Sequence, residues 1–193
     1  MKTITKYFPV FIIFLFFVIG SCDGPINHID ESFSDAELKK GTPKKIVTLT
    51  QEEIDGILYM REEEKLAHDV YVKFYELYAH KIFLNISLSE QRHTDAVLRL
   101  INFYGLADPA LNVPGEFKNE ELQDMYDSLV LLGTDLNSAL EVGVLIEETD
   151  IEDISALMEQ TEVKNILQVY ENLLNGSQNH LNSFETTLDK LDQ

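Results

Sequence analysis

Four stretches of the chain repeat apolar residues at alternating spacings of three and four positions, the pattern of a helix with one buried face. Capping signals and glycines bound the predicted helices at residues 51–78, 86–104, 136–159 and 163–191, with a shorter helix at 120–132. No strand pattern competes with them. The sequence therefore predicts an all-α domain, a four-helix bundle with one short accessory helix between bundle helices 2 and 3.

Each predicted buried face carries ionisable side chains near its middle. An isolated buried carboxylate is costly and needs a compensating cation. Several carboxylates that converge on one core are therefore hard to explain without a metal ion. The candidate ligands at these positions are Glu64, Glu90, His93, Glu147 and His180.

The spacing of these residues matches most of a known pattern for two metal ions. In helix bundles a pair of iron or manganese ions takes one Glu from each of two helices and a Glu-x-x-His motif from each of the other two. Residues 90–93 supply one such motif intact, whereas Ser177 replaces the Glu of the second, three positions before His180. Two interpretations stay open: Asp150, three positions after Glu147, substitutes for the missing ligand, or the site holds one metal tightly.

Glu90 has a second interpretation. Ser87 precedes it by three positions, so the two residues match a capping box that would place Glu90 at the start of its own helix. Because Ile86 and His93 continue the buried phase across this position, we favour an inward-facing Glu90.

The helical phase also assigns the neighbours of the candidate ligands. Glu62 and Glu63 are expected in solvent or in surface ion pairs, whereas Tyr71 lies on the core face and is a candidate hydrogen-bond partner of a ligand. Gly176 interrupts the fourth pattern. One interpretation is a turn after which Ser177 caps a new helix. Because the apolar stripe keeps its phase across the glycine, we favour a continuous helix in which a neighbour packs close to it, at a cost of about 1 kcal/mol.

The first residues predict export. Lys2 and Lys6 precede an apolar run at 7–19, which is too short for a stable membrane span. Residues 19–22, Ile-Gly-Ser-Cys, resemble a bacterial lipobox, so residues 1–22 are predicted to be a lipoprotein signal peptide with Cys22 as the acylated residue. The alternative is an uncleaved anchor helix with an incidental cysteine. Cys22 is the only cysteine of the chain, which excludes an internal disulfide.

Composition and charge indicate how the rest of the chain is organised and where the protein works. Residues 23–47 are polar, with Gly and Pro, and predict a flexible tether, while 48–193 form the helical domain. Removal of residues 1–22 takes away two lysines, so the formal charge falls by two from −19 to −21. Such a surface repels phosphate backbones, which excludes nucleic acid as a natural partner, and attracts cations. We expect a bacterial cell-envelope protein, lipid-anchored and facing the periplasm or the cell surface.

Four segments in order resemble an uncharacterised ferritin-like family, domain of unknown function 2202, over about residues 49–188. The resemblance implies a ferritin-like four-helix bundle with a carboxylate and histidine metal centre, and it implies no assigned reaction. Rubrerythrin-like members of the wider superfamily place two acids as Glu147 and Asp150 are placed, and keep a Glu where this chain has Ser177. The four segments are Met60–Ala67, Ser89–His93, Ile146–Ile151 and Gly176–Leu181.

Three function classes follow from these patterns. Carboxylate and imidazole ligands favour iron or manganese, most simply as a dinuclear centre, with a mononuclear or a zinc centre as alternatives. The leading hypothesis is a ferroxidase or peroxide-reducing oxidoreductase. The second is metal binding without turnover, as in a scavenger or sensor, and the third is a helical interaction module. A homo-oligomer is compatible with each.

Overall fold

A computed structural model of the protein describes residues 28–29 and 46–191. Within these ranges the fold is all-α, as predicted, apart from a two-residue antiparallel ladder between β1 (His28–Ile29) and β2 (Ile46–Val47), which the sequence pattern did not predict. The predicted signal peptide with Cys22, and most of the predicted tether, lie outside the described residues. The five helices are α1 (Gln51–Tyr78), α2 (Lys81–Tyr104), α3 (Glu120–Leu132), α4 (Leu136–Glu159) and α5 (Lys164–Leu191).

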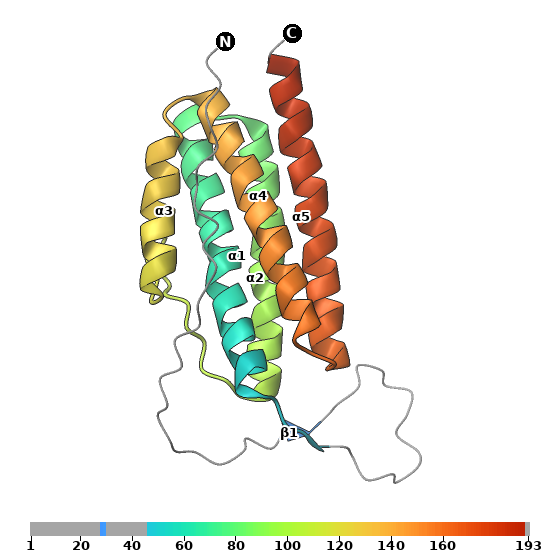
Figure 1. The fold of residues 1–193 in the computed structure, drawn as a ribbon. Helices are drawn as coiled ribbons and strands as arrows, with labels where there is room; N and C mark the ends of the chain where they lie inside the picture. Colours follow the sequence, from blue (N-terminus) through green and yellow to red (C-terminus); the bar gives the residue numbers. More distant parts are fainter. Residues whose placement is uncertain (1–27, 30–45, 192–193) are drawn as a thin grey trace.

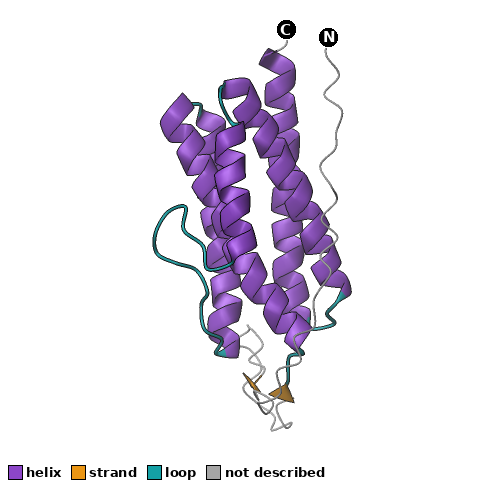
Figure 2. Cartoon of the chain, turned by 60° about the vertical axis from the view of Figure 1, so that its left-hand side comes forward, coloured by secondary structure: helices purple, strands orange, loops and turns teal. Residues whose placement is uncertain are grey.

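The four long helices lie side by side as two antiparallel pairs, α1 with α2 and α4 with α5 (Figure 1). The pairs meet where α2 packs on α5 and α1 packs on α4, and α3 lies against α1 and α4 on the outside. Because α2 and α4 run in the same direction, the chain needs a long connection between them. The loop at 105–119, visible in Figure 2, and α3 provide it.

Local signals explain where the helices begin. Thr50 and Glu53 form the predicted capping box of α1: the Glu53 amide donates to Thr50 Oγ1 at 3.2 Å, and the Thr50 amide donates to Glu53 Oε2 at 2.8 Å. In contrast, α2 begins at Lys81 and not at residue 86 as predicted. Its N-cap, His80, makes no side-chain capping hydrogen bond, so this start has no capping signature in the sequence.

The earlier start of α2 decides the interpretation of Glu90. Ser87 lies inside the helix, where its hydroxyl donates to the carbonyl of Leu84 at 2.9 Å. A residue in the helix interior cannot cap the first turn, so the capping-box alternative is wrong. Glu90 is free to face the core.

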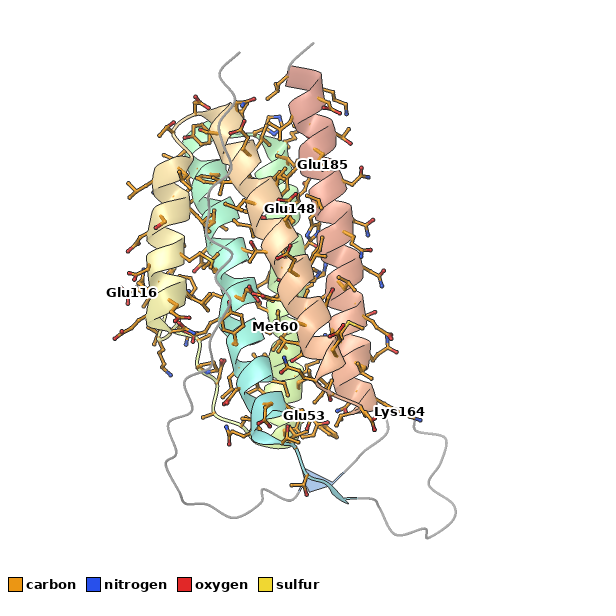
Figure 3. The ribbon with its side chains drawn as sticks, viewed as in Figure 1. Glu53, Met60, Glu116, Glu148, Lys164 and Glu185 are labelled. Atoms are coloured by element: carbon orange, nitrogen blue, oxygen red, sulfur yellow. The ribbon has the colours of Figure 1, made fainter. Side chains whose placement is uncertain are left out.

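The apolar core has two clusters, one toward each end of the long helices. On α1, Ile57 and Met60 belong to one cluster, while Leu66 and the residues after it belong to the other. The same division occurs on α2, α4 and α5, so a layer of polar side chains crosses all four helices between the clusters. Figure 3 labels Met60 on α1 and Glu148 on α4, near which the layer crosses these two helices.

No helix among the described residues is long and apolar enough to cross a membrane.

Candidate metal centre

The polar layer contains all the candidate ligands predicted from the sequence. Glu64, Glu90 and Glu147 are each 1% exposed, Asp150 is 5% exposed and Ser177 is completely buried. The His93 and His180 side chains keep 12% and 10% exposure, so the imidazoles form the more accessible edge of the layer. Each of the four long helices supplies its polar residues from close to its midpoint.

Glu90 lies between the two histidines and offers one carboxylate oxygen to each. Its Oε2 lies 2.8 Å from Nδ1 of His93, and its Oε1 lies 2.6 Å from Nδ1 of His180. The rings of His93 and His180 stack with their centroids 5.5 Å apart. The same nitrogens also approach the flanking acids: His93 Nδ1 is 3.1 Å from Glu64 Oε2, and His180 Nδ1 is 3.5 Å from Glu147 Oε2.

These contacts form two groups of potential metal ligands that share Glu90. Glu64, Glu90 and His93 make one group, and Glu90, Glu147 and His180 make the other. Within each group, one ligand atom per residue lies within 4.8 Å of the others. A carboxylate with one oxygen in each group has the position of a bridging ligand between two ions.

Several of these close contacts are not aligned hydrogen bonds. Glu90 Oε1 and His180 Nδ1 have no hydrogen-bond partner of acceptable geometry although they are 2.6 Å apart, and Glu64 Oε1 is buried without a partner. Buried polar atoms are rarely left unpaired. Oxygen and nitrogen atoms that converge in this way fit a donor set for metal ions better than a hydrogen-bonded core.

Two neighbours hold the carboxylates of α4. Tyr71, the predicted hydrogen-bond partner, donates its hydroxyl to Glu147 Oε1 at 2.6 Å. Ser177 donates a short hydrogen bond to Asp150 Oδ2 and a second one to the carbonyl of Leu173 at 3.1 Å. Asp150 thus lies beside the centre, bound by the residue that replaces the expected Glu, and belongs to neither of the two ligand groups.

Without a metal ion, charged histidines balance part of the buried negative charge. Burial opposes ionisation of Glu90, but the adjacent His180 and His93 imidazoles outweigh it and hold the Glu90 pKa at about 2. Burial disfavours the charged imidazoles, yet the surrounding carboxylates raise the pKa of His93 to about 11 and that of His180 to about 9. The histidines therefore act as the counter-cations of the carboxylates.

Two histidines do not compensate every carboxylate. Burial raises the pKa of Glu64 to about 8 against the effect of His93, and burial with the nearby Glu90 raises that of Glu147 to about 7. For Asp150, burial and the neighbouring Glu64 and Glu147 carboxylates raise the pKa well above its usual value. The excess of buried acids over bases is the electrostatic condition that divalent cations relieve.

The expectation for Glu62 and Glu63 was wrong, because both are buried, at 4% and 5% exposure. Glu62 accepts a hydrogen bond from the amide of Lys118 at 2.7 Å. Helix α1 packs against α2, α3 and α4, so it buries more than the single face that its apolar stripe marks. The sequence feature that could have indicated this burial is the run of three consecutive acids at 62–64 inside the helix. In contrast, Glu148 is exposed, as the phase of α4 predicts.

The fold and the site define an all-α protein with a buried carboxylate and histidine cluster. The chain belongs to the family described as "Uncharacterized protein domain (DUF2202)", whose model matches residues 53–193. The predicted resemblance to this family is confirmed.

A relative and two solved structures are similar to the chain. It is 42% identical over 143 residues to "Uncharacterized protein MJ0754" of Methanocaldococcus jannaschii, a match that covers 73% of this chain and 77% of the relative. The crystal structure of hypothetical protein MJ0754 matches with a TM-score of 0.75 and 40% identity, covering 80% of this chain and 88% of that one. A DUF305 fragment from Deinococcus radiodurans matches with a TM-score of 0.57 at 12% identity, covering 73% and 97%, a likeness of fold alone.

Proposed function

We propose that the protein is a ferritin-like four-helix bundle whose polar layer holds a dinuclear metal centre. Glu64 and His93 would hold one ion, Glu147 and His180 would hold the other, and Glu90 would offer one oxygen to each. The observation that carries this proposal is the position of Glu90, with one oxygen facing each histidine nitrogen at 2.8 and 2.6 Å. Asp150 is the further carboxylate that is available to the centre.

The donor set favours iron or manganese. Carboxylate oxygens suit hard divalent ions, and imidazole nitrogens suit iron and zinc, whereas copper and soft metals prefer sulfur or more nitrogen. A pair of irons supplies cycling between ferrous and ferric states, which supports ferroxidase or peroxide-reducing activity. The protein would contribute a largely buried site in which Tyr71 orients Glu147 and Ser177 orients Asp150.

Ser177 supports a second candidate function, metal binding without turnover. Dinuclear centres of this class take a Glu at this position of the fourth bundle helix. Here the position is completely buried and its hydroxyl is engaged by Asp150 and Leu173. With one bridging carboxylate fewer, the centre would hold one or both ions as a scavenger or sensor does.

We further propose that the domain works at the bacterial cell envelope, exported and anchored to the lipid bilayer through an acylated Cys22. The support is the sequence of residues 1–22, which combines two lysines, an apolar run and a lipobox-like end. Metabolic labelling with a radioactive fatty acid tests this: the label is expected on the wild-type protein and absent from Cys22→Ala.

Metal content is the direct test of the centre. The full-length protein, purified in detergent and reconstituted with Fe²⁺ or Mn²⁺, is desalted and its bound metal counted by mass spectrometry. The test variant is Glu90→Ala with His93→Ala, which removes the proposed bridge and one ligand from α2. The control variant is Glu148→Ala with Arg92→Ala, which removes one exposed charge from α4 and one from α2. Circular dichroism verifies that all three proteins are helical.

The count separates the candidates. Two ions per chain, lost only in the Glu90 and His93 variant, support the dinuclear centre and lead to assays of ferrous oxidation and peroxide consumption. One ion per chain with no turnover favours the binding protein. No specific metal in the reconstituted wild type contradicts both. Redox turnover that persists undiminished in the Glu90 and His93 variant contradicts the enzyme hypothesis.

A further inference from the structure

A cavity opens on the surface between the first turns of α2 and the last turns of α5. Its volume is about 400 Å³, and it is lined by side chains of both helices. No member of the two ligand groups lines it. On α2 the lining includes Ile82, Asn85 and Ile86, and on α5 it includes Asn182, Ser183 and Lys190.

The inner end of the α2–α5 cavity lies one helical turn from the proposed centre. The two helices run antiparallel (Figure 1), and Glu90 Oε1 of α2 lies 2.6 Å from His180 Nδ1 of α5. Ile86 precedes Glu90 by four positions, and Ser183 follows His180 by three. In an antiparallel pair, both displacements lead one turn toward the same end of the bundle. The cavity therefore begins one turn above the contact between Glu90 and His180.

The two imidazoles lie on the same side of the centre as the cavity. His93 packs against the backbone of α5 at Gly176, and His180 stacks on His93 with the ring centroids 5.5 Å apart. Their side chains keep 12% and 10% exposure, whereas the Glu90 carboxylate between them is almost completely buried. A small molecule that approaches the centre between α2 and α5 therefore meets the imidazole edges first.

The α2–α5 cavity is polar without being acidic. The chain has a formal charge of −19, yet among the described residues the lining contains no carboxylate, and its one charged side chain is Lys190. Asn85 and Asn182 offer amide donors and acceptors. The hydroxyls of Ser183 and Thr187 donate to carbonyls four residues earlier on α5, at 2.7 and 2.8 Å, which leaves their lone pairs as acceptors. Such a lining forms hydrogen bonds and does not concentrate cations.

We propose that the α2–α5 cavity is the entrance through which small hydrogen-bonding ligands without positive charge reach the metal centre. This inference rests on the proposed metal centre and identifies the class of molecule that its ions would receive from outside. Two observations carry it. The cavity ends one turn from the contact between Glu90 and His180, and the imidazoles beside it are the partly exposed members of the ligand groups.

An entrance controls the rates of binding and not the affinity, because a barrier on the route slows arrival and departure by the same factor. The test uses the full-length protein in detergent, loaded with Co²⁺ and mixed with azide in a stopped-flow instrument. The change in the Co²⁺ absorption bands gives the association and dissociation rates. Azide is the probe because it is small, carries no positive charge, accepts hydrogen bonds and coordinates metal ions.

Two variants narrow the cavity, one from each wall: Ser183→Phe on α5 and Asn85→Phe on α2. Gln178→Phe is the matched control, since it places the same side chain at an exposed position of α5 that does not line the cavity. Ser183→Ala is the second control, because it removes the hydroxyl and leaves the cavity open. Circular dichroism and Co²⁺ counting verify that each protein is helical and loaded. If one bulky variant loses metal, the variant of the other wall decides.

We expect each bulky variant to slow both association and dissociation of azide about tenfold, equivalent to a barrier higher by about 1.4 kcal/mol, with an unchanged dissociation constant. Both controls are expected to stay within about twofold of wild type, as is usual for exposed substitutions. Unchanged rates in the bulky variants overturn the entrance. A changed dissociation constant with an unchanged association rate also overturns it, because the cavity then acts on the geometry of the centre.

The same experiment separates this inference from the metal centre itself. A wild type that binds Co²⁺ but whose spectrum azide does not change overturns the entrance and leaves the metal centre in place. A wild type that binds no Co²⁺ overturns both.

Discussion

Gly176 and His93 lie so close that a side chain at position 176 would displace the His93 ring. A Cβ built on Gly176 would lie 2.4 Å from Nε2 of His93 and 2.5 Å from Cε1. Helix α5 continues through Gly176, as the phase of its apolar stripe predicts, and the neighbour that packs close to the glycine is a candidate metal ligand. Because Gly176 has no side chain, the His93 imidazole can pack directly against the backbone of α5.

Gly176→Ala is expected to displace His93 and to lower the metal content of the centre. Alanine favours the helix by about 1 kcal/mol over glycine, so a loss of thermal stability or of metal would show that the clash outweighs helix propensity. Metal counting and thermal unfolding measure the two effects. Gln178→Ala, at an exposed position of the same helix, is the control and is expected to leave both unchanged. Full metal content in Gly176→Ala would contradict this role of the glycine.

Tyr71→Phe is expected to lower the metal affinity of the ligand group that contains Glu147. The substitution removes the 2.6 Å hydrogen bond to Glu147 Oε1 and leaves this buried carboxylate without its donor. Loss of such an outer partner typically lowers metal affinity about 10- to 100-fold. Competition with a chelator of known affinity measures the change.

The control for Tyr71→Phe is Tyr78→Phe. Tyr78 lies two turns further along α1, and its hydroxyl donates to the carbonyl of Gly133, away from the polar layer. It is expected to lower stability without changing metal affinity. Equal metal affinities of the two variants and wild type would exclude Tyr71 from the centre.

Ser177→Ala is expected to destabilise the protein by about 1 to 3 kcal/mol, the cost of leaving a buried carboxyl without its donor. The matched control is Ser183→Ala, since Ser183 donates to the carbonyl four residues earlier, at 2.7 Å, as Ser177 does at 3.1 Å, but lies exposed on α5. Ser183→Ala is expected to change the free energy of unfolding by less than about 0.5 kcal/mol. Urea unfolding of the metal-free proteins compares them, and equal midpoints would show that the contact of Ser177 with Asp150 contributes nothing.

Asp69→Asn is expected to reduce stability at neutral pH and to have little effect in acid. Asp69 Oδ2 accepts hydrogen bonds from Lys65 Nζ at 2.6 Å and from the Gly115 amide at 2.9 Å, and Oδ1 lies 2.8 Å from His68 Nδ1. Burial opposes ionisation, but these three partners outweigh it and lower the pKa of Asp69. The carboxylate therefore ties the loop before α3 to α1.

The direction of this pKa shift fixes the pH dependence. A carboxyl with a lowered pKa in the folded state stabilises the protein fully above its unfolded pKa of about 3.9, and the contribution disappears as pH falls through the folded value. Urea unfolding is expected to show Asp69→Asn less stable by about 2 kcal/mol at pH 7, with the difference closing below about pH 4. Asp95→Asn, an exposed acid on α2, is the control. A difference that does not vary with pH would contradict the assignment to this carboxylate.

The sequence located four of the five helices to within about one residue, because an apolar period of 3.6 is a local property of each helix. Its failures are also local. The sequence does not mark the start of α2, because His80 makes no capping hydrogen bond. The apolar stripe of α1 predicts one buried face and leaves Glu63 in solvent, whereas the structure buries Glu63. The second buried face of α1 exists because α2, α3 and α4 all pack against this helix. The sequence of α1 alone does not contain that information.

The sequence by itself determined that carboxylates and histidines occupy inward positions near the middle of the four long helices, because the phase of each helix orients its own side chains. Only the tertiary structure decided their partners. Glu90 meets both His93 and His180, and Tyr71 reaches Glu147 across 76 positions of the chain. These contacts depend on the rotation and relative shift of packed helices, which are set by side-chain packing between segments far apart in the chain.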